Sequence, residues 1–264
     1  MLVTLAVKVA RHIVEARRQS IATLVRERGY LPIQTISRQF RISPATARRD
    51  LDELVSQKLL TRTHGGALSD FNRQFASADE RRKVDAAAKR VIGAAGATMI
   101  HPGMTIYIDA GTTPFAVAEA LAVRRTPGIC VVTASLAVAR LLGEIPEFEV
   151  HLTAGLYLGR QEMLAGPQVA QSLRAWHFEL AFVGCEGLDA DGVHNSQDDV
   201  VAVTHVLREL GSRVVLCLAR SKVGAHAPVR VAADLNGFTL LTDASRSELA
   251  KAHVPLGDAI LIQA

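Results

Sequence analysis

One stretch of the sequence, residues 43–51, combines side chains that can read DNA. It runs Ser-Pro-Ala-Thr-Ala-Arg-Arg-Asp-Leu. A helix-turn-helix places the first residues of its second helix in the major groove, where small or hydrogen-bonding side chains and cations are expected. The hydroxyls can approach base edges or the backbone, and the arginines can contact phosphate or guanine. The candidate DNA-contacting residues of this stretch are Ser43, Pro44, Ala45, Thr46, Arg48 and Arg49.

A short β-capable run follows, at residues 59–63, and His64-Gly65-Gly66 after it can turn sharply because glycine accepts positive φ. This pattern predicts a β-wing. In such a wing Arg62, His64 and Gly65 are candidates for phosphate or minor-groove contact. The alternative for the two arginines of the preceding stretch is a solvated helix face that pairs with Asp52 and Glu53.

A second candidate site lies at residues 105–113, which run Thr-Ile-Tyr-Ile-Asp-Ala-Gly-Thr-Thr. The pattern predicts a strand that ends in a small polar loop, with a helix from about Pro114. Backbone N–H groups and hydroxyls at a helix N-terminus can hold a phosphate, assisted by the helix dipole. A Gly-Thr-Thr turn also fits an ordinary strand-to-helix connection, so both interpretations stay open at this point.

Other residues capable of chemistry are scattered. His194, Asp198 and Asp199 are close in sequence, but their spacing without a further partner fits a solvated loop and helix start, so no metal site is expected. The 3 cysteines lie far apart in apolar runs, which predicts buried reduced thiols and a cytoplasmic location. No Gly-x-Ser-x-Gly elbow or Walker loop occurs, so no catalytic residue and no cofactor is assigned.

Three short helices must position the DNA-reading stretch. Residues 15–28 place apolar side chains at helical spacing and stop at Gly29. A second helix is predicted over residues 32–40, where the proline suits the first turn. A third is predicted from the N-cap Ser43 to about Lys58. Together with the wing, these elements predict a mainly α winged helix-turn-helix over residues 15–68, preceded by an N-terminal extension over residues 1–14.

The remainder of the chain alternates between strand-like and helix-like segments. Residues 69–82 lose periodicity and are predicted to be a linker, although the charge run at residues 79–83 equally fits the solvated start of a helix. A helix is expected near 84–100, and strands near 104–109, 129–133, 148–152, 179–183, 213–218 and 238–242. This alternation predicts a doubly wound, Rossmann-like α/β domain with a mainly parallel sheet over residues 83–264.

The charge distribution separates these two parts. Residues 1–83 carry 16 Lys and Arg against 8 Asp and Glu, whereas the remainder carries 14 against 18. A positive segment beside a mildly negative one favours a polyanion as the partner of the first. The most apolar opening stretch is broken by Lys8 and Arg11 and is too short to span a bilayer, so no membrane partner is expected.

The sequence resembles the DeoR family of bacterial sugar-metabolism regulators. The DNA-binding resemblance rests on residues 21–30, 43–51 and 62–67, with Ala47 where the family usually has isoleucine or valine. Residues from about 82 to 243 resemble the family's effector domain, which is similar in fold to phosphosugar isomerases. The matching pieces are Lys89, residues 109–113, residues 131–135, Gly155, Gly166, Gly184, Gly187 and residues 221–224.

The resemblance implies a phosphorylated sugar or sugar alcohol as the effector. It implies that Gly111, Thr112 and Thr113 hold the phosphate, that Asp109 meets a hydroxyl and that Lys222 adds a positive charge. Ser135 and Gly155 complete the expected effector site. Three positions depart from the family pattern, where Ala134, Ala154 and Ala219 replace asparagine, glycine and aspartate.

The leading hypothesis is therefore a DNA-binding repressor of a carbohydrate operon, acting as a homodimer or homotetramer on double-stranded DNA. One alternative is an isomerase-like enzyme of phosphosugars with an appended DNA-binding module. It rests on fold analogy alone, and Asp109 is its only candidate base. The other alternative, suggested by Ala134 and Ala219, is a DNA-binding protein that no longer responds to a ligand.

Overall fold

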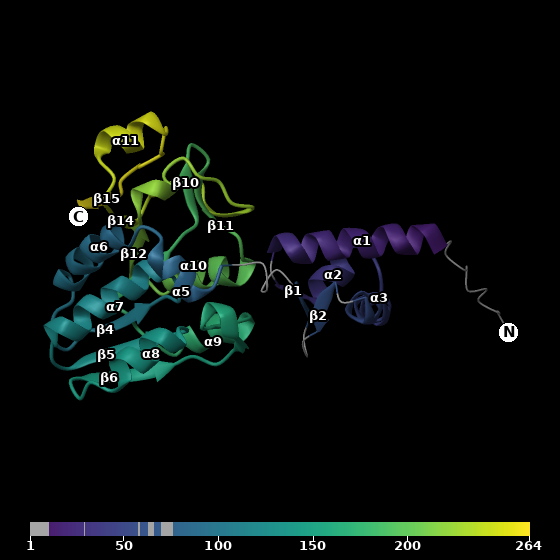
Figure 1. The fold of residues 1–264 in the computed structure, drawn as a ribbon, viewed down its shortest axis with the longest axis horizontal. Helices are drawn as coiled ribbons and strands as arrows, with labels where there is room; N and C mark the ends of the chain where they lie inside the picture. Colours follow the sequence, from purple (N-terminus) through teal and green to yellow (C-terminus); the bar gives the residue numbers. More distant parts are fainter. Residues whose placement is uncertain (1–10, 29, 58, 63–65, 70–75) are drawn as a thin grey trace. The chain divides into compact units, whose positions relative to one another are not determined.

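The chain folds into two compact units, residues 1–74 and 75–264. The computed structural model describes residues 11–28, 30–57, 59–62, 66–69 and 76–264 (Figure 1). The division between the units falls within the segment that the sequence predicts as a linker, and each unit is described separately below.

The N-terminal unit is a winged helix-turn-helix, as predicted. Its elements are α1 (Arg11–Arg28), β1 (Tyr30–Pro32), α2 (Ile33–Gln39), α3 (Pro44–Ser56), β2 (Leu60–Arg62) and β3 (Gly66–Ser69). The strands form an antiparallel sheet in the order β1-β3-β2. Two details differ from expectation: α1 begins at Arg11 rather than at Glu15, and β1 is a strand that the sequence did not predict. The predicted helix stop at Gly29 lies outside the described residues.

The helices of this unit enclose one small core. Ile21 and Val25 from α1, Ile36 from α2, and Leu51 and Leu54 from α3 are completely buried together. The 3.6-residue helical repeat places such residues on one side of each helix, which buries them and leaves the polar side for solvent.

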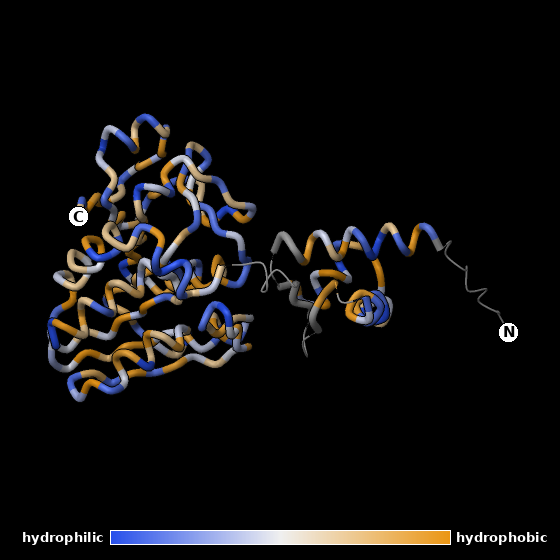
Figure 2. Tube along the Cα trace, in the orientation of Figure 1, coloured by the Kyte–Doolittle hydropathy of each residue, from blue (hydrophilic) through white to orange (hydrophobic). Residues whose placement is uncertain are grey.

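The C-terminal unit is built on a parallel sheet of 7 strands in the order β15-β14-β12-β9-β4-β5-β6 (Figure 1). All strand pairs within it are parallel. The strands are β4 (Thr105–Ile108), β5 (Ile129–Thr133), β6 (Phe148–Leu152), β9 (Leu180–Gly184), β12 (Arg213–Leu218), β14 (Phe238–Thr242) and β15 (Ile260–Gln263). The predicted mainly parallel sheet is confirmed, and β15 is added at one edge. Figure 2 shows hydrophobic colour along these strands, as expected for strands covered on both faces.

Helices cover both faces of this sheet, which makes it doubly wound. Neighbouring strand residues point to opposite faces, so Ile106 belongs to one hydrophobic cluster and Tyr107 to the other. Residues of α6 (Ala86–Thr98), α7 (Thr112–Arg124) and α8 (Leu136–Gly143) lie in the first cluster, and residues of α9 (Pro167–Leu173) and α10 (Asp198–Glu209) in the second. Helices α6 and α7 approach so closely that a Cβ on Gly93 would lie 2.3 Å from the carbonyl oxygen of Ala116.

Several short elements surround the sheet. Helix α5 (Ala78–Lys83) begins with a capping box, in which Ser77 and Glu80 bond to each other's backbone N–H groups. The charge run is therefore a helix start, the second of the two interpretations that the sequence allowed. The other short elements are β7 (Leu156–Leu158), η1 (Gly159–Gln161), β8 (Met163–Ala165), β10 (Gly187–Asp189), β11 (Gly192–Asn195), η2 (Arg220–Lys222), β13 (Val229–Ala232) and α11 (Arg246–Lys251).

The burial of the cysteines and the apolar character of the helices can be compared with expectation. Cys185 and Cys217 are free thiols in the core, as predicted, whereas Cys130 is half-buried. Among the described residues, no helix combines the length and the apolar character needed to cross a bilayer.

Candidate functional site

The local sequence fixes the start of α3. Ser43 has extended backbone angles, and its Oγ accepts a hydrogen bond of 3.1 Å from the backbone N–H of Thr46. Pro44 occupies the first helical turn, where its missing N–H group has no cost. The helix therefore begins at a defined residue, with the predicted DNA-contacting side chains in its first turns.

The two sides of α3 differ as a recognition helix requires. Ala47, Asp50, Leu51 and Leu54 are buried against the core of the N-terminal unit. Ala47 has no exposed surface, which agrees with the expectation that this position faces inward. The predicted contact residues lie on the other side: Ser43, Pro44, Ala45, Arg48 and Arg49 are exposed, and Thr46 is half-buried.

Asp50 fixes the orientation of α3, a role that no pattern in the sequence indicated. Its carboxylate is 2% exposed and accepts hydrogen bonds from Nε of Arg17 at 2.7 Å and from Nε of Arg18 at 3.1 Å. A buried carboxylate needs such partners, because an unpaired charge away from water is costly. Two arginines of α1 thus hold the inner side of the predicted reading helix.

The predicted wing is described only in part. Strands β2 and β3 pair antiparallel, with Arg62 opposite Ala67. The side chain of Arg62 is not among those described, and His64 and Gly65 lie outside the described residues.

The second candidate site lies where the strand order of the large sheet reverses. From β4 the chain continues to β5 and β6 toward one edge, and from β9 it continues to β12, β14 and β15 toward the other. Open α/β sheets bind ligands outside the carboxyl ends of the strands at such a point. Here a cavity of about 240 Å³ lies beside the loops that follow β4 and β9. The predicted effector residues that line it are Asp109, Gly111, Thr112, Thr113 and Lys222.

Charged side chains converge on this cavity. Asp109 is buried, its Oδ2 accepts a hydrogen bond of 3.3 Å from the N–H of Gly184, and its burial raises the pKa of the carboxyl group above the usual value. Lys89 is also buried, and burial followed by the nearby charges of Lys222 and Arg81 lowers its pKa to about 8. Lys222 and Arg81 thus act on Lys89 as like charges that a bound anion would offset, while the carboxylate of Asp85 raises the pKa of Lys89.

Oγ1 of Thr113 and Oε1 of Gln161 are buried polar atoms in the cavity wall, and neither has a hydrogen-bond partner among the residues that the structure describes. Buried polar atoms are nearly always paired, so each exception needs an explanation. Thr113 lies in the first turn of α7, where the N-cap Gly111 supplies no side chain to bond the free N–H groups. Hydrogen-bonding groups are therefore left unused at a helix N-terminus that opens on a cavity.

Two of the expected effector residues do not line this cavity. Oγ of Ser135 instead accepts a hydrogen bond of 3.2 Å from the N–H of Val138 and caps α8. Gly155 packs closely on β8, where a Cβ would lie 2.9 Å from the carbonyl oxygen of Ala165. Capping and close packing account for both residues in this structure, and their expected role at the effector site stays a prediction.

Comparison with known proteins identifies the two units. A family model described as the DeoR C terminal sensor domain matches residues 84–244, and one described as the DeoR-like helix-turn-helix domain matches residues 17–73. The chain belongs to the DeoR family of transcriptional regulators. The predicted resemblance is thereby confirmed over both units.

Named DeoR-family relatives extend over most of the chain. The glycerol-3-phosphate regulon repressor of Escherichia coli (strain K12) is 31% identical over 229 residues, which cover 86% of this chain and 90% of the relative. The putative aga operon transcriptional repressor of Escherichia coli O157:H7 is 28% identical over 210 residues, covering 78% and 77%. Among solved structures, ribose 5-phosphate isomerase from Plasmodium falciparum aligns over 51% of this chain and 52% of its own, with a TM-score of 0.36 and 11% identity.

The sensor unit of this DeoR-family chain places further residues in the cavity wall. They come from segments far from the predicted loop: Arg81 from α5, Lys89 from α6, Gln161 from η1, Glu186 from the loop after β9 and Asn195 from β11. Only Lys89 could have been found beforehand, through its place in the family resemblance. The others lie in a charge run or in short irregular segments that carry no motif.

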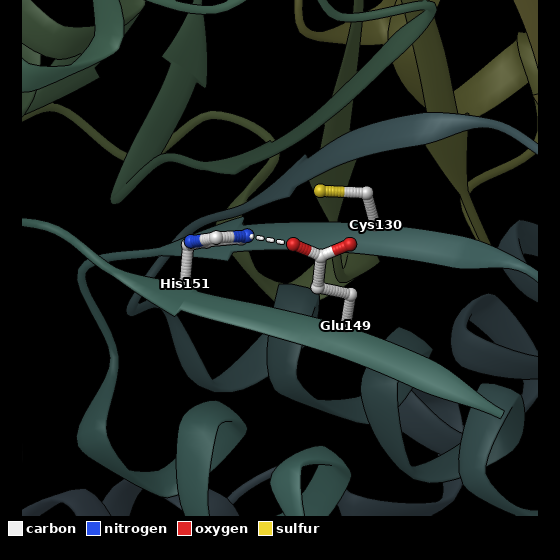
Figure 3. A group of neighbouring side chains, drawn as sticks. All are labelled: Cys130, Glu149 and His151. Carbon is white, nitrogen blue, oxygen red and sulfur yellow. Dashed lines mark hydrogen bonds and ion pairs between the residues drawn. The ribbon is translucent and has the colours of Figure 1, made fainter. Parts of the chain in front are cut away.

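The described residues of the sensor unit include two groups of potential metal ligands. Cys130, Glu149 and His151 lie together on the neighbouring strands β5 and β6, where His151 Nε2 and Glu149 Oε1 are 2.7 Å apart (Figure 3). Asp189, His194 and His226 form the other group. His194 was expected in a solvated loop with Asp198, but it is 2% exposed and belongs to β11. All residues of this short strand, which the sequence did not predict, are buried.

Proposed function

We propose that this chain is a cytoplasmic repressor of a carbohydrate-metabolism operon. It binds double-stranded operator DNA as a homodimer or homotetramer, and a phosphorylated sugar or sugar alcohol in the cavity beside β4 and β9 releases it. The observation that carries this proposal is the pair of unused groups at the start of α7, the uncapped helix N-terminus and the buried unpaired hydroxyl of Thr113. The names of the relatives, one of which is a glycerol-3-phosphate regulon repressor, support the effector class.

In the DNA complex, the first turns of α3 enter the major groove. Arg48 and Arg49 contact phosphate or guanine, and the other contacts come from Ser43, Pro44, Ala45 and Thr46. The wing adds Arg62, His64 and Gly65 at the backbone or minor groove. The exposure of the outer side of α3 and its attachment through Asp50 support this arrangement.

In the effector complex, the phosphate lies at the N-terminus of α7. Gly111 and Thr112 offer backbone N–H groups, and Thr113 donates its hydroxyl. Lys222 supplies positive charge near the phosphate, and Asp109 accepts a hydrogen bond from a sugar hydroxyl. Two features of the cavity support this assignment. Asp109 is a buried carboxyl group to which a sugar hydroxyl can donate a hydrogen bond. The like charges around Lys89 are offset when a phosphate binds.

Helix α5 connects the two activities. It is the first described element after residues 70–75, and its Arg81 together with Val84 and Asp85 lines the cavity. An effector that contacts these residues changes the free energy of the segment that leads to the DNA-binding unit. If the effector binds the DNA-free protein by ~1.4 kcal/mol more favourably than the DNA-bound protein, operator affinity falls tenfold.

A gel-shift experiment on the DNA upstream of the chain's own gene tests the proposal. Specific binding at physiological salt should be lost on addition of one member of a panel of sugar phosphates and glycerol 3-phosphate. Arg48→Ala should weaken DNA binding, whereas Thr112→Ala should preserve DNA binding and reduce the response to the effector. The proposal fails if no fragment is bound specifically, or if the two variants exchange these effects.

A further inference from the structure

Three metal-ligating side chains meet beside the peripheral sheet of the sensor unit. Asp189 ends β10, His194 lies in β11, and His226 lies in the loop before β13. Each can offer one nitrogen or oxygen, and these three atoms lie within 4.8 Å of one another. Nε2 of His194 is 2.9 Å from Oδ1 of Asp189, and Nδ1 of His226 is 2.8 Å from Oδ2 of the same carboxylate.

The group is held in place by the surrounding backbone. The N–H of Asp191 donates a hydrogen bond of 2.8 Å to Oδ1 of Asp189, which orients the carboxylate. The rings of His194 and His226 are adjacent, with centroids 4.1 Å apart. Neighbouring imidazoles that share one carboxylate form a compact set of ligand atoms rather than a loose surface cluster.

His194 supplies an independent observation. The residue is 2% exposed, and its Nδ1 has no hydrogen-bond partner among the described residues. An unpaired polar atom in a buried ring costs free energy, so this nitrogen calls for an explanation such as a bound ion or water. The ring therefore has unused bonding capacity next to two other ligand residues.

We propose that Asp189, His194 and His226 bind a divalent transition metal ion of the Zn²⁺ class. Imidazole nitrogen suits zinc and its neighbours, whereas Mg²⁺ and Ca²⁺ prefer ligand sets made entirely of oxygen. Two imidazoles and one carboxylate are a known zinc set, with a water in the fourth position. The ring of His226 is 61% exposed, so a metal ion can enter from that side.

The bound ion would join two segments that both reach the effector cavity. The N–H of Glu186 donates to the carbonyl of His194, and Asn195 follows His194 in β11, so the hairpin that holds the ligands also supplies Glu186 and Asn195 to the cavity wall. On the other segment, Lys222 lines the same cavity and lies shortly before His226. The ion would therefore fix the relative position of these cavity residues.

The Cys130 group in Figure 3 serves as an internal comparison. Its Glu149 and His151 side chains are 73% and 39% exposed, and no buried unpartnered atom of the described residues belongs to it. An exposed acid and imidazole on an outer strand need no ion to be stable. Cys130→Ser thus provides a control variant that removes a different set of ligands.

Titration calorimetry with Zn²⁺ on tag-free, chelator-treated full chain tests the site. We expect saturable binding of one ion per chain and a Zn²⁺-dependent rise in Tm. His226→Ala removes an exposed ring and Asp189→Asn keeps the side-chain shape, so both variants should fold; each should weaken Zn²⁺ binding at least tenfold and abolish the rise in Tm. Cys130→Ser and His101→Ala, which replaces an exposed histidine elsewhere, should leave both readouts unchanged.

The proposal is overturned if the wild-type chain shows no saturable Zn²⁺ binding. It is equally overturned if binding survives His226→Ala or disappears with Cys130→Ser. Because none of these measurements involves DNA or a phosphosugar, their outcome is independent of the repressor function proposed above.

Discussion

Replacing Thr113 with valine should raise stability and lower effector affinity at the same time. The side chain is 2% exposed, its Oγ1 has no partner within the described part of the chain, and valine has nearly the same shape. Leaving a buried hydroxyl unpaired costs about 1–3 kcal/mol, so its removal should raise the free energy of unfolding by about 1 kcal/mol. If the hydroxyl donates to a phosphate, the complex loses a charge-assisted hydrogen bond of about 1.5–3 kcal/mol, or roughly 10- to 150-fold in affinity.

Thr126→Val is the matched control. Thr126 is 5% exposed and its Oγ1 also lacks a partner among the described residues, but it does not line the cavity. Its replacement should raise stability by a similar amount and leave effector affinity unchanged. Urea unfolding of the two variants and calorimetry with the phosphosugar that releases the operator provide both quantities.

The two variants together separate the possible explanations. If Thr113→Val lowers stability, its hydroxyl is paired in the free protein, and the reasoning about an unused group is wrong. If Thr113→Val retains full effector affinity, the phosphate does not lie at the start of α7. An equal loss of effector affinity in both threonine variants would show an indirect effect and would also refute the assignment.

Three further predictions follow from single residues. Gly93→Ala should destabilise the sensor unit by about 3 kcal/mol in urea unfolding because its Cβ would meet the backbone of α7, whereas Gly143→Ala, with no atom within 4 Å, should be neutral or gain up to ~1 kcal/mol. Arg49→Ala should weaken DNA binding and reduce the slope of log affinity against log salt by about 1 in gel shifts; an unchanged slope would exclude a phosphate contact. Burial raises the pKa of Asp199 from 3.8 to about 6, so the folded state binds more protons than the unfolded state between these pH values, and stability should fall by up to ~3 kcal/mol as pH rises through them. Asp199→Asn should remove this loss in pH-dependent melting curves, and a variant no more stable than wild type at pH above ~7 would contradict the burial effect.

The long elements were predictable because their residue patterns are strong. Strands such as Arg213–Leu218 consist of apolar runs, and α3 carries both an N-cap serine and a proline in its first turn. The short strands β10 and β11 were missed because their glycines, Asp189 and Asn195 are typical of turns. These two strands pair with each other in a hairpin, and β11 also pairs with the more distant β13, a pairing that leaves no mark in a local pattern.

The site was predictable to a similar extent. The strand-to-helix loop with Thr112 and Thr113 was found because consecutive residues supply its hydrogen-bonding groups. Arg81 and Glu186 were not found, since they reach the cavity from elements distant in sequence. The capping box of Ser77 and Glu80 was visible as Ser-Ala-Asp-Glu and would have indicated that Arg81 lies in a helix and not in a linker.

The helix that begins after Ser77 also determines where this regulator could be recombined with others. Its residues belong to the sensor unit, and Arg81 and Val84 form part of the cavity wall. A biosensor that carries a foreign DNA-binding head should therefore be spliced upstream of Ser77. A chimera joined after Lys83 would lose Arg81 from the cavity wall, however well its new head bound its own promoter.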